Sequence, residues 1–217
     1  MKFTYFLGWA AYRGLLDVLC GRRSFNSENV PPEGAVILAS NHASFFDPPL
    51  VGVGLTRELN YLGRKSLFRF RALRWFMDQV NAVPVDRDGG GGAGLKIILD
   101  RLNAGGGILL FPEGTRTRDG RLQPARSGIG LIVIKSTAPV VPVRVFGTHE
   151  AWGYGQQIPR RHPVAVKYGL PLTFAELRAE ARNCSKTRLK EIYQEVADQI
   201  MAAIAKLEPW EDRRHFP

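Results

Sequence analysis

The sequence has few of the residues that build disulfide, metal and nucleophile sites. Only two cysteines occur in 217 residues, so no disulfide framework can form and a reducing, cytosolic compartment is expected. The four histidines show no HExxH-like spacing and no cysteine pair has metal-ligand spacing, which predicts no metal and no other bound cofactor. No Gly-x-Ser-x-Gly turn is present, which leaves a serine nucleophile of that type without support.

A long apolar run is missing too. The most apolar stretch, residues 3–12, is followed by Arg13 and falls short of the roughly 20 residues that a membrane-spanning helix needs. No small-residue cleavage site follows before Arg22, so the stretch is a poor match to a secretory signal. Residues 1–29 are predicted to be an N-terminal amphipathic helical segment that either lies in a membrane interface or packs on the core. Helical spacing puts five residues on one side of it: Phe3, Phe6, Leu7, Ala10 and Gly14.

Cations exceed anions along the whole chain. Thirty Lys and Arg residues against twenty Asp and Glu residues give a net charge of +10. A dispersed basic excess favours an anionic partner, which could be a phosphate-bearing substrate, a membrane surface, an acidic carrier protein or nucleic acid. The hydrophobic fraction of 45% is ordinary for a folded protein and excludes a disordered chain.

Short apolar strands alternate with amphipathic helices along the rest of the chain. Strands are expected at 35–39, 60–63, 82–85, 108–111, 140–146 and 164–168. This order predicts an α/β fold with a mixed, partly parallel central sheet flanked by helices, an N-terminal interfacial helix and a long C-terminal helix. Residues 30–172 are expected to form the α/β domain, and the helical region 173–217 to pack on it. Pro142 inside its strand indicates an edge or a bulge.

The first polar cluster follows the first of these strands. His42 and Asp47 can form a dyad, in which one imidazole nitrogen takes a proton and the carboxylate holds the other N–H. This spacing needs a loop, because five residues do not share one face of a helix. The alternative is structural: Asp47, followed by Pro48, is also a good helix N-cap, and His42 could be an ordinary loop histidine.

The second cluster, residues 111–118, also follows a strand directly. Gly114 allows backbone to approach a ligand, Thr115 offers a hydroxyl, and Arg116 offers a planar fork that matches phosphate. Glu113 could orient that arginine or accept from substrate hydroxyls. The alternative is a solvated, arginine-rich turn. In sheets of this kind ligands bind beyond the carboxyl ends of the strands, so both clusters are expected on one rim.

A third cluster mixes cations with aromatic residues over 63–76. Arg64 and Lys65 suit phosphate recognition at the site end of a helix that is expected to run to about Gln79. Farther along, basic side chains beside Trp75 suit an anionic membrane surface. Nucleic acid would also attract this mixture, but no nucleic-acid fold signature is present, so no nucleic-acid partner is expected.

Four motifs in order resemble those of the glycerolipid acyltransferase family, the phospholipid/glycerol acyltransferases. They read N-H-A-S-F-F-D at 41–47, G-R-K-S-L at 63–67 with D-R at 86–87, F-P-E-G-T-R-T-R at 111–118, and P-V-V-P-V at 139–143. The third motif is the most specific, although Thr117 stands where serine is usual. The chain departs from many members at Arg126-Ser127-Gly128, where two lysines or a lysine usually precede the glycine. That departure bears on acceptor specificity.

The resemblance implies an O-acyltransferase of the 1-acylglycerol-3-phosphate type, which makes phosphatidate for phospholipid biosynthesis. An acyl thioester, either acyl-CoA or an acyl-carrier protein, would donate the chain to the sn-2 hydroxyl of lysophosphatidate by direct attack. The residues that match the family's functional positions are His42 and Asp47 for catalysis, Glu113, Gly114, Thr115 and Arg116 for acceptor binding with the arginine on phosphate, and Arg64 and Lys65 for a second phosphate contact.

The sequence leaves open two alternatives to this activity. The acceptor could be another lysolipid, such as a lysophospholipid or a lyso-ornithine lipid. From another class, the chain could be a non-catalytic lipid-binding module that uses the same basic and aromatic surface. Either way an anionic membrane surface is an expected partner, with peripheral association at the cytoplasmic face of the cell membrane.

Overall fold

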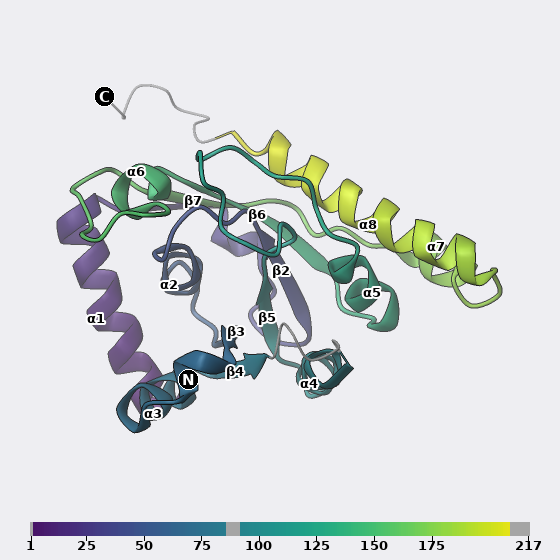
Figure 1. Cartoon of the computed structure of the whole chain (residues 1–217), viewed down its shortest axis with the longest axis horizontal. Helices are drawn as coiled ribbons and strands as arrows, with labels where there is room; N and C mark the ends of the chain where they lie inside the picture. Colours follow the sequence, from purple (N-terminus) through teal and green to yellow (C-terminus); the bar gives the residue numbers. More distant parts are fainter. Residues whose placement is uncertain (1, 86–91, 209–217) are drawn as a thin grey trace.

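A seven-stranded sheet forms the centre of the computed structural model, which describes residues 2–85 and 92–208 (Figure 1). The strand order is β1-β7-β6-β2-β5-β3-β4. From β6 to β4 neighbouring strands run parallel, whereas β7 is antiparallel to β6 and carries β1 parallel to itself. The strands are β1 (Arg23–Phe25), β2 (Val36–Ser40), β3 (Leu59–Arg64), β4 (Ala82–Val85), β5 (Gly107–Leu110), β6 (Val140–Phe146) and β7 (Ala165–Tyr168).

Helices cover both faces of this sheet (Figure 1). The α-helices are α1 (Phe3–Cys20), α2 (Asp47–Val53), α3 (Arg71–Gln79), α4 (Gly92–Asn103), α5 (Gly128–Lys135), α6 (Thr148–Trp152), α7 (Ala175–Glu180) and α8 (Lys186–Lys206). Two short 3₁₀ helices, η1 (Ser27–Asn29) and η2 (Lys65–Phe68), complete the described elements.

Strand β2 shows why the chain folds into layers. All of its residues are buried, and alternate side chains enter two different hydrophobic cores. Leu38 packs in the core beneath α1 and α2, whereas Ile37 packs in the core beneath α4, α5 and α8. A continuous apolar run is therefore required of this strand, because parallel strands covered by helices on both faces have no solvent-facing side.

The predicted α/β class, the partly parallel sheet and the long C-terminal helix are confirmed. The basic-aromatic helix is shorter than expected, since η2 precedes it and α3 begins only at Arg71. Strand β1 and helix α6 were not predicted. Strand β1 falls within residues 1–29 and joins the sheet through β7, so this segment is not helical throughout.

Pro142 does not mark an edge strand, because β6 lies between β7 and β2. The segment that follows β7 leaves regular pairing opposite Pro142. Between the Val143–Tyr168 pair and the Val140–Leu172 bridge, three residues (169–171) stand opposite two (141–142). The missing N–H of Pro142 is accommodated at this irregular position, where its carbonyl accepts from the N–H of Gly169 at 2.8 Å.

Helix α1 packs on the core with one side and exposes the other, and its contact with a membrane interface stays a prediction. Tyr5, Leu16 and Cys20 are buried and pack on the domain. The predicted apolar side is exposed to solvent, with Phe3 at 74% and Leu7 at 50% exposure. None of the described helices is both long and apolar enough to cross a membrane.

Candidate active site

The candidate residues gather where three parallel strands end. His42 follows β2 and Glu113 follows β5, its neighbour in the sheet, while Arg64 is the last residue of β3. Parallel neighbours bring their carboxyl ends to one edge, so loops distant in sequence meet there. The 41–47 loop and the 111–118 loop therefore lie against each other.

His42 and Asp47 form a hydrogen-bonded pair. The Nδ1 atom of His42 lies 2.8 Å from Oδ2 of Asp47, and the aspartate side chain is fully buried. The same oxygen accepts the backbone N–H groups of Ala43 and Ser44 at 2.6 and 2.7 Å. With Nδ1–H donating to the carboxylate, the other ring nitrogen is left as a proton acceptor.

The N-cap alternative for Asp47 is wrong in its detail. Asp47 is already the first residue of α2, and Phe46 occupies the cap position without a side-chain cap. The carboxylate turns back to the loop that precedes the helix instead of capping the helix. Its three donors orient an anion in a fixed place, which suits a group that holds a histidine rather than one that only starts a helix.

The imidazole is also fixed by its other neighbours. The ring of His42 stacks on Phe111, with centroids 3.8 Å apart and planes 15° from parallel. Its backbone N–H donates to Oε1 of Glu113 at 2.9 Å, and its carbonyl accepts the N–H of Thr117 at 2.8 Å. Two loops from neighbouring strands are thus bonded together at the histidine itself.

Glu113 is not the partner of Arg116 that one sequence interpretation suggested. Its side chain is buried and faces the backbone of His42, and no ion pair joins it to Arg116 in the part of the chain that the structure describes. Burial raises the pKa of Glu113 to about 7, although hydrogen bonds from the backbone of His42 and Gln123 oppose this and the charge of Asp47 adds to it.

Arg116 lies over an aromatic ring. Its guanidinium carbon is 3.6 Å from the centroid of Phe45 and 5.7 Å from that of Tyr154. Burial lowers the pKa of Arg116, the carboxylate of Asp47 counters this, and the nearby charge of Arg64 lowers it further. Among the described residues no partner is found for its buried Nη1 atom, so the guanidinium has donors left for an anion.

The remaining predicted residues frame this centre. Gly114 has φ +75°, a backbone conformation in which other residues are strained, and its Cα faces the Arg126 side chain. The side chains of Thr115 and Lys65 are exposed, the latter at the start of η2 beside Arg64. The D-R pair at 86–87 lies outside the described residues.

A cavity of about 270 Å³ opens at the histidine. It is bounded by His42, by the strand end and loop around Phe111, and by Arg126 and Ile129 at the start of α5. Most of its other lining is aliphatic or glycine, as a site for a hydrocarbon chain requires. No group of three or more potential metal-ligating side chains gathers among the residues that the structure describes.

Sequence reasoning missed the aromatic residues around the dyad. Phe45 supports Arg116, and the ring of Trp152 lies about 5 Å from those of Phe45 and Phe46. Ser44 donates to the Trp152 carbonyl at 2.7 Å. Phe45 stands inside the first motif, and its large aromatic side chain next to the candidate dyad could have indicated a role in the site. Trp152 and Tyr154 have no such signal in the sequence, because only folding brings their segment to this loop.

Comparisons with known proteins identify the family of the chain. The acyltransferase family model matches residues 22–146, more than half of the chain. A 1-acyl-sn-glycerol-3-phosphate acyltransferase of Bacillus subtilis is 28% identical over 199 residues, covering 88% of this chain and 96% of that protein. A chloroplastic enzyme of the same name from Brassica napus is 31% identical over 133 residues, which cover 60% of this chain and 38% of that protein.

The fold also matches a solved structure. The crystal structure of the 1-acyl-sn-glycerophosphate acyltransferase PlsC from Thermotoga maritima superposes with a TM-score of 0.68, covering 94% of this chain and 79% of that one. At 22% identity this likeness shows the fold alone.

Proposed function

Because the chain belongs to the acyltransferase family, we propose that it is an O-acyltransferase that acylates the sn-2 hydroxyl of lysophosphatidate to give phosphatidate. The observation that carries the chemistry is the bond between His42 Nδ1 and the buried carboxylate of Asp47, at the mouth of an apolar cavity. The names of the relatives support the acceptor, since the Bacillus subtilis protein aligns along nearly its whole length.

The geometry supports direct transfer with histidine as the base. The free ring nitrogen of His42 takes the proton of the sn-2 hydroxyl while that oxygen attacks the thioester carbonyl carbon. The C–S bond then breaks, and the thiolate leaves with the proton returned by the imidazolium. Asp47, 2.8 Å from Nδ1, stabilises the transient positive charge. General-base help of this kind typically contributes about 10²- to 10⁴-fold to a rate.

Arg116 is positioned to hold the acceptor phosphate. Its guanidinium is planar, rests on Phe45 and lies close enough to Arg64 for the two charges to interact. Two nearby cations match a phosphomonoester better than a headgroup of lower charge. The donor's acyl chain would occupy the cavity at His42, with the thioester carbonyl at its mouth. Either a CoA or a carrier-protein thioester is compatible with the basic surface.

Acyl transfer from labelled thioesters to lysophosphatidate in detergent micelles tests the reaction. Wild type should form phosphatidate with at least one of the two donor types, and His42→Ala should lose about 10²-fold or more in kcat. A panel of lysophospholipid and lyso-ornithine acceptors runs in parallel. Transfer only to another acceptor would replace the proposed substrate, and silence with every donor and acceptor would favour the lipid-binding module.

A surface formed by α1, α3 and the segment before α3 supports contact with an anionic membrane. Phe3 on α1 and Trp75 on α3 are 74% and 63% exposed, and the two helices lie close together (Figure 1). Five exposed cations occur in the segment that leads to Trp75: Arg64, Lys65, Arg69, Arg71 and Arg74. Sedimentation with anionic vesicles should fall for Phe3→Ser and Trp75→Ser. It should not fall for Ile158→Ser, a control at 75% exposure, and equal binding by all three would refute the surface.

A further inference from the structure

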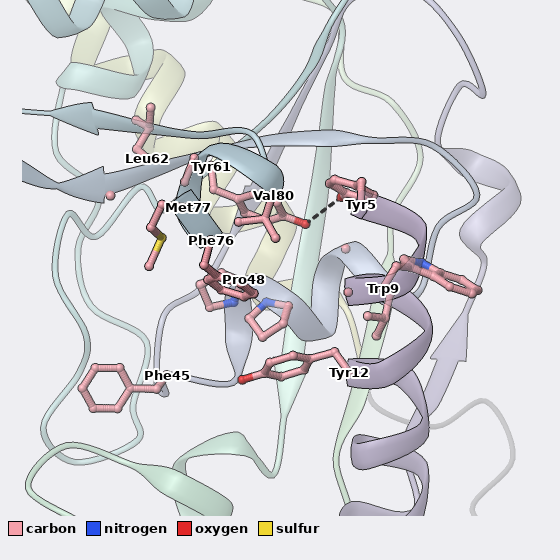
Figure 2. Close-up of a pocket in the computed structure, with 16 residues that line it drawn as sticks. Tyr5, Trp9, Tyr12, Phe45, Pro48, Tyr61, Leu62, Phe76, Met77 and Val80 are labelled. Atoms are coloured by element: carbon pink, nitrogen blue, oxygen red, sulfur yellow. Dashed lines mark hydrogen bonds between the residues drawn. The ribbon is translucent and has the colours of Figure 1, made fainter. Parts of the chain in front are cut away.

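A second cavity lies beside the one that contains the histidine. It measures about 310 Å³ and is lined by residues of α1, α2, β3 and α3 (Figure 2). Helix α1 contributes Tyr5, Gly8 and Tyr12, and α3 contributes Phe76 and Met77. No charged side chain is found among the described residues that line it. A cavity of this size and lining suits a hydrocarbon chain.

Two tyrosine hydroxyls in its wall already have partners. The hydroxyls of Tyr5 and Tyr61 point toward each other at 3.2 Å (Figure 2). The Tyr5 oxygen also accepts the N–H of Leu59 at 3.2 Å. Because these groups are paired with one another, an apolar ligand can contact the two tyrosines without leaving their hydroxyls unbonded.

The cavity is connected to the proposed phosphate anchor by one aromatic ring. Phe45 lines the cavity and carries the guanidinium of Arg116 on its face at 3.6 Å. The two cavities share wall residues, among them Pro48 and Leu62, but only the smaller one includes His42. A molecule anchored at Arg116 can therefore reach one apolar space at the base and a different one past Phe45.

The proposed reaction brings two hydrocarbon chains to this place. The donor chain is bonded to the carbonyl carbon that is attacked, so it belongs in the cavity that contains His42. The acceptor already carries an acyl chain on the adjacent glycerol carbon, and its phosphate would lie on Arg116. We propose that the cavity between α1 and α3 binds this resident sn-1 chain of the lysolipid. This assignment rests on the proposed function and adds the place where the acceptor's own chain is recognised.

Glycine 8 offers a way to fill the cavity without disturbing its walls. It lines the cavity, and a Cβ atom built on it has no neighbour within 4 Å. Gly14, on the same helix, also has open space around a Cβ atom but is not among the lining residues. Gly8→Leu is therefore the test variant and Gly14→Leu its matched control, because both replace a helical glycine by the same residue. Gly8→Ala adds a smaller, graded change.

The measurement is KM for lysophosphatidates of increasing sn-1 chain length, used as monomers with one fixed donor. For wild type and Gly14→Leu, KM should fall about fourfold for each methylene that enters the cavity. Gly8→Leu should raise KM for the longest acceptor at least tenfold and flatten this dependence, with kcat and donor KM unchanged. Gly8→Ala should lie between them, and equal unfolding midpoints establish that the variants fold.

Three results would overturn the assignment in different ways. An unchanged acceptor KM in Gly8→Leu would mean that the sn-1 chain stays outside the cavity. A changed dependence on the donor's chain length would mean that the cavity binds the donor instead. If wild type acylates no lysophosphatidate, the proposed function fails and the assignment fails with it. The activity of the wild type therefore separates this case from the first two, in which wild type is active.

Discussion

Replacing Asp47 with asparagine should separate the charge of this side chain from its shape. Oδ2 accepts three hydrogen bonds, from His42 Nδ1–H and from the backbone of Ala43 and Ser44. The amide oxygen of asparagine can occupy the same position and accept all three. The loop is then expected to keep its form while the imidazolium loses its counter-charge.

The cost can be worked from the contact. A hydrogen bond to a charged group is worth about 1 kcal/mol more than a neutral one. Two unit charges about 4 Å apart attract by about 4 kcal/mol at the effective dielectric constant found near protein surfaces. In the proposed reaction the imidazolium forms as the hydroxyl proton is taken, so most of this difference falls on the transition state. A loss of about 3–5 kcal/mol corresponds to roughly 10²- to 10⁴-fold in kcat.

Steady-state acyl transfer with both substrates varied is the assay. Asp47→Asn should lower kcat by that factor and leave both KM values within threefold, while urea unfolding reports whether the fold is kept. A kcat within tenfold of wild type in a stably folded variant would refute the reasoning, since Asp47 would then be only a structural residue of the loop. A large rise in acceptor KM would instead assign it to binding.

Two further predictions concern stability. The folded-state pKa of Glu113 is raised by burial from 4.5 to about 7, so the folded protein binds more protons than the unfolded chain between these pH values and loses stability as pH rises. The unfolding free energy is measured by urea titration at pH 4.5 and at pH 7.5. Between these pH values wild type should lose up to about 3 kcal/mol more than Glu113→Gln does. Equal losses in the two proteins would contradict the raised pKa. A Cβ on Gly130 of α5 would lie 1.9 Å from the Tyr193 carbonyl oxygen of α8, so Gly130→Ala should cost about 1–3 kcal/mol of unfolding free energy. Gly128→Ala, with open space in the same helix, should cost nothing, and similar values for the two would mean that the helices separate freely.

The elements that the sequence predicted well are those with a strong local signal. Residues 36–40 are apolar at every position but the last, and parallel strands covered on both faces require this pattern. Strand β1 has only three residues, Arg23–Phe25, with no buried side chain, so the sequence shows no alternation of apolar and polar residues that would predict it. It is a strand because β7 offers it a free edge. Helix α6 is five residues long, which is too short for a helical pattern to show in the sequence.

The candidate site was predictable where chemistry and spacing coincide. His42 and Asp47 follow a strand at a separation that only a loop can close, and the structure places them 2.8 Å apart. The position of Glu113 was not predictable. Its neighbour Arg116 suggested a pair, but the pairing depends on which way each side chain leaves its turn, and the backbone N–H of His42 is the nearer partner for Glu113. Contacts of this kind between loops leave no trace in local sequence.

The loop that carries the proposed base, His42, also carries the ring that supports the proposed phosphate anchor, Arg116. His42 and Phe45 are three residues apart, and Arg116 rests on the latter from a loop that is bonded to the backbone of the former. A thioester is reactive enough that position and a base decide the rate. In the proposed acceptor a short glycerol unit separates hydroxyl from phosphate, so one rigid loop sets both the reacting distance and the headgroup preference. Variants at Phe45 should therefore change rate and headgroup selectivity together. Variants at Gly8, on the α1 side of the second cavity, should change chain selectivity alone, because in this proposal that part of the acceptor contacts a different element of the fold.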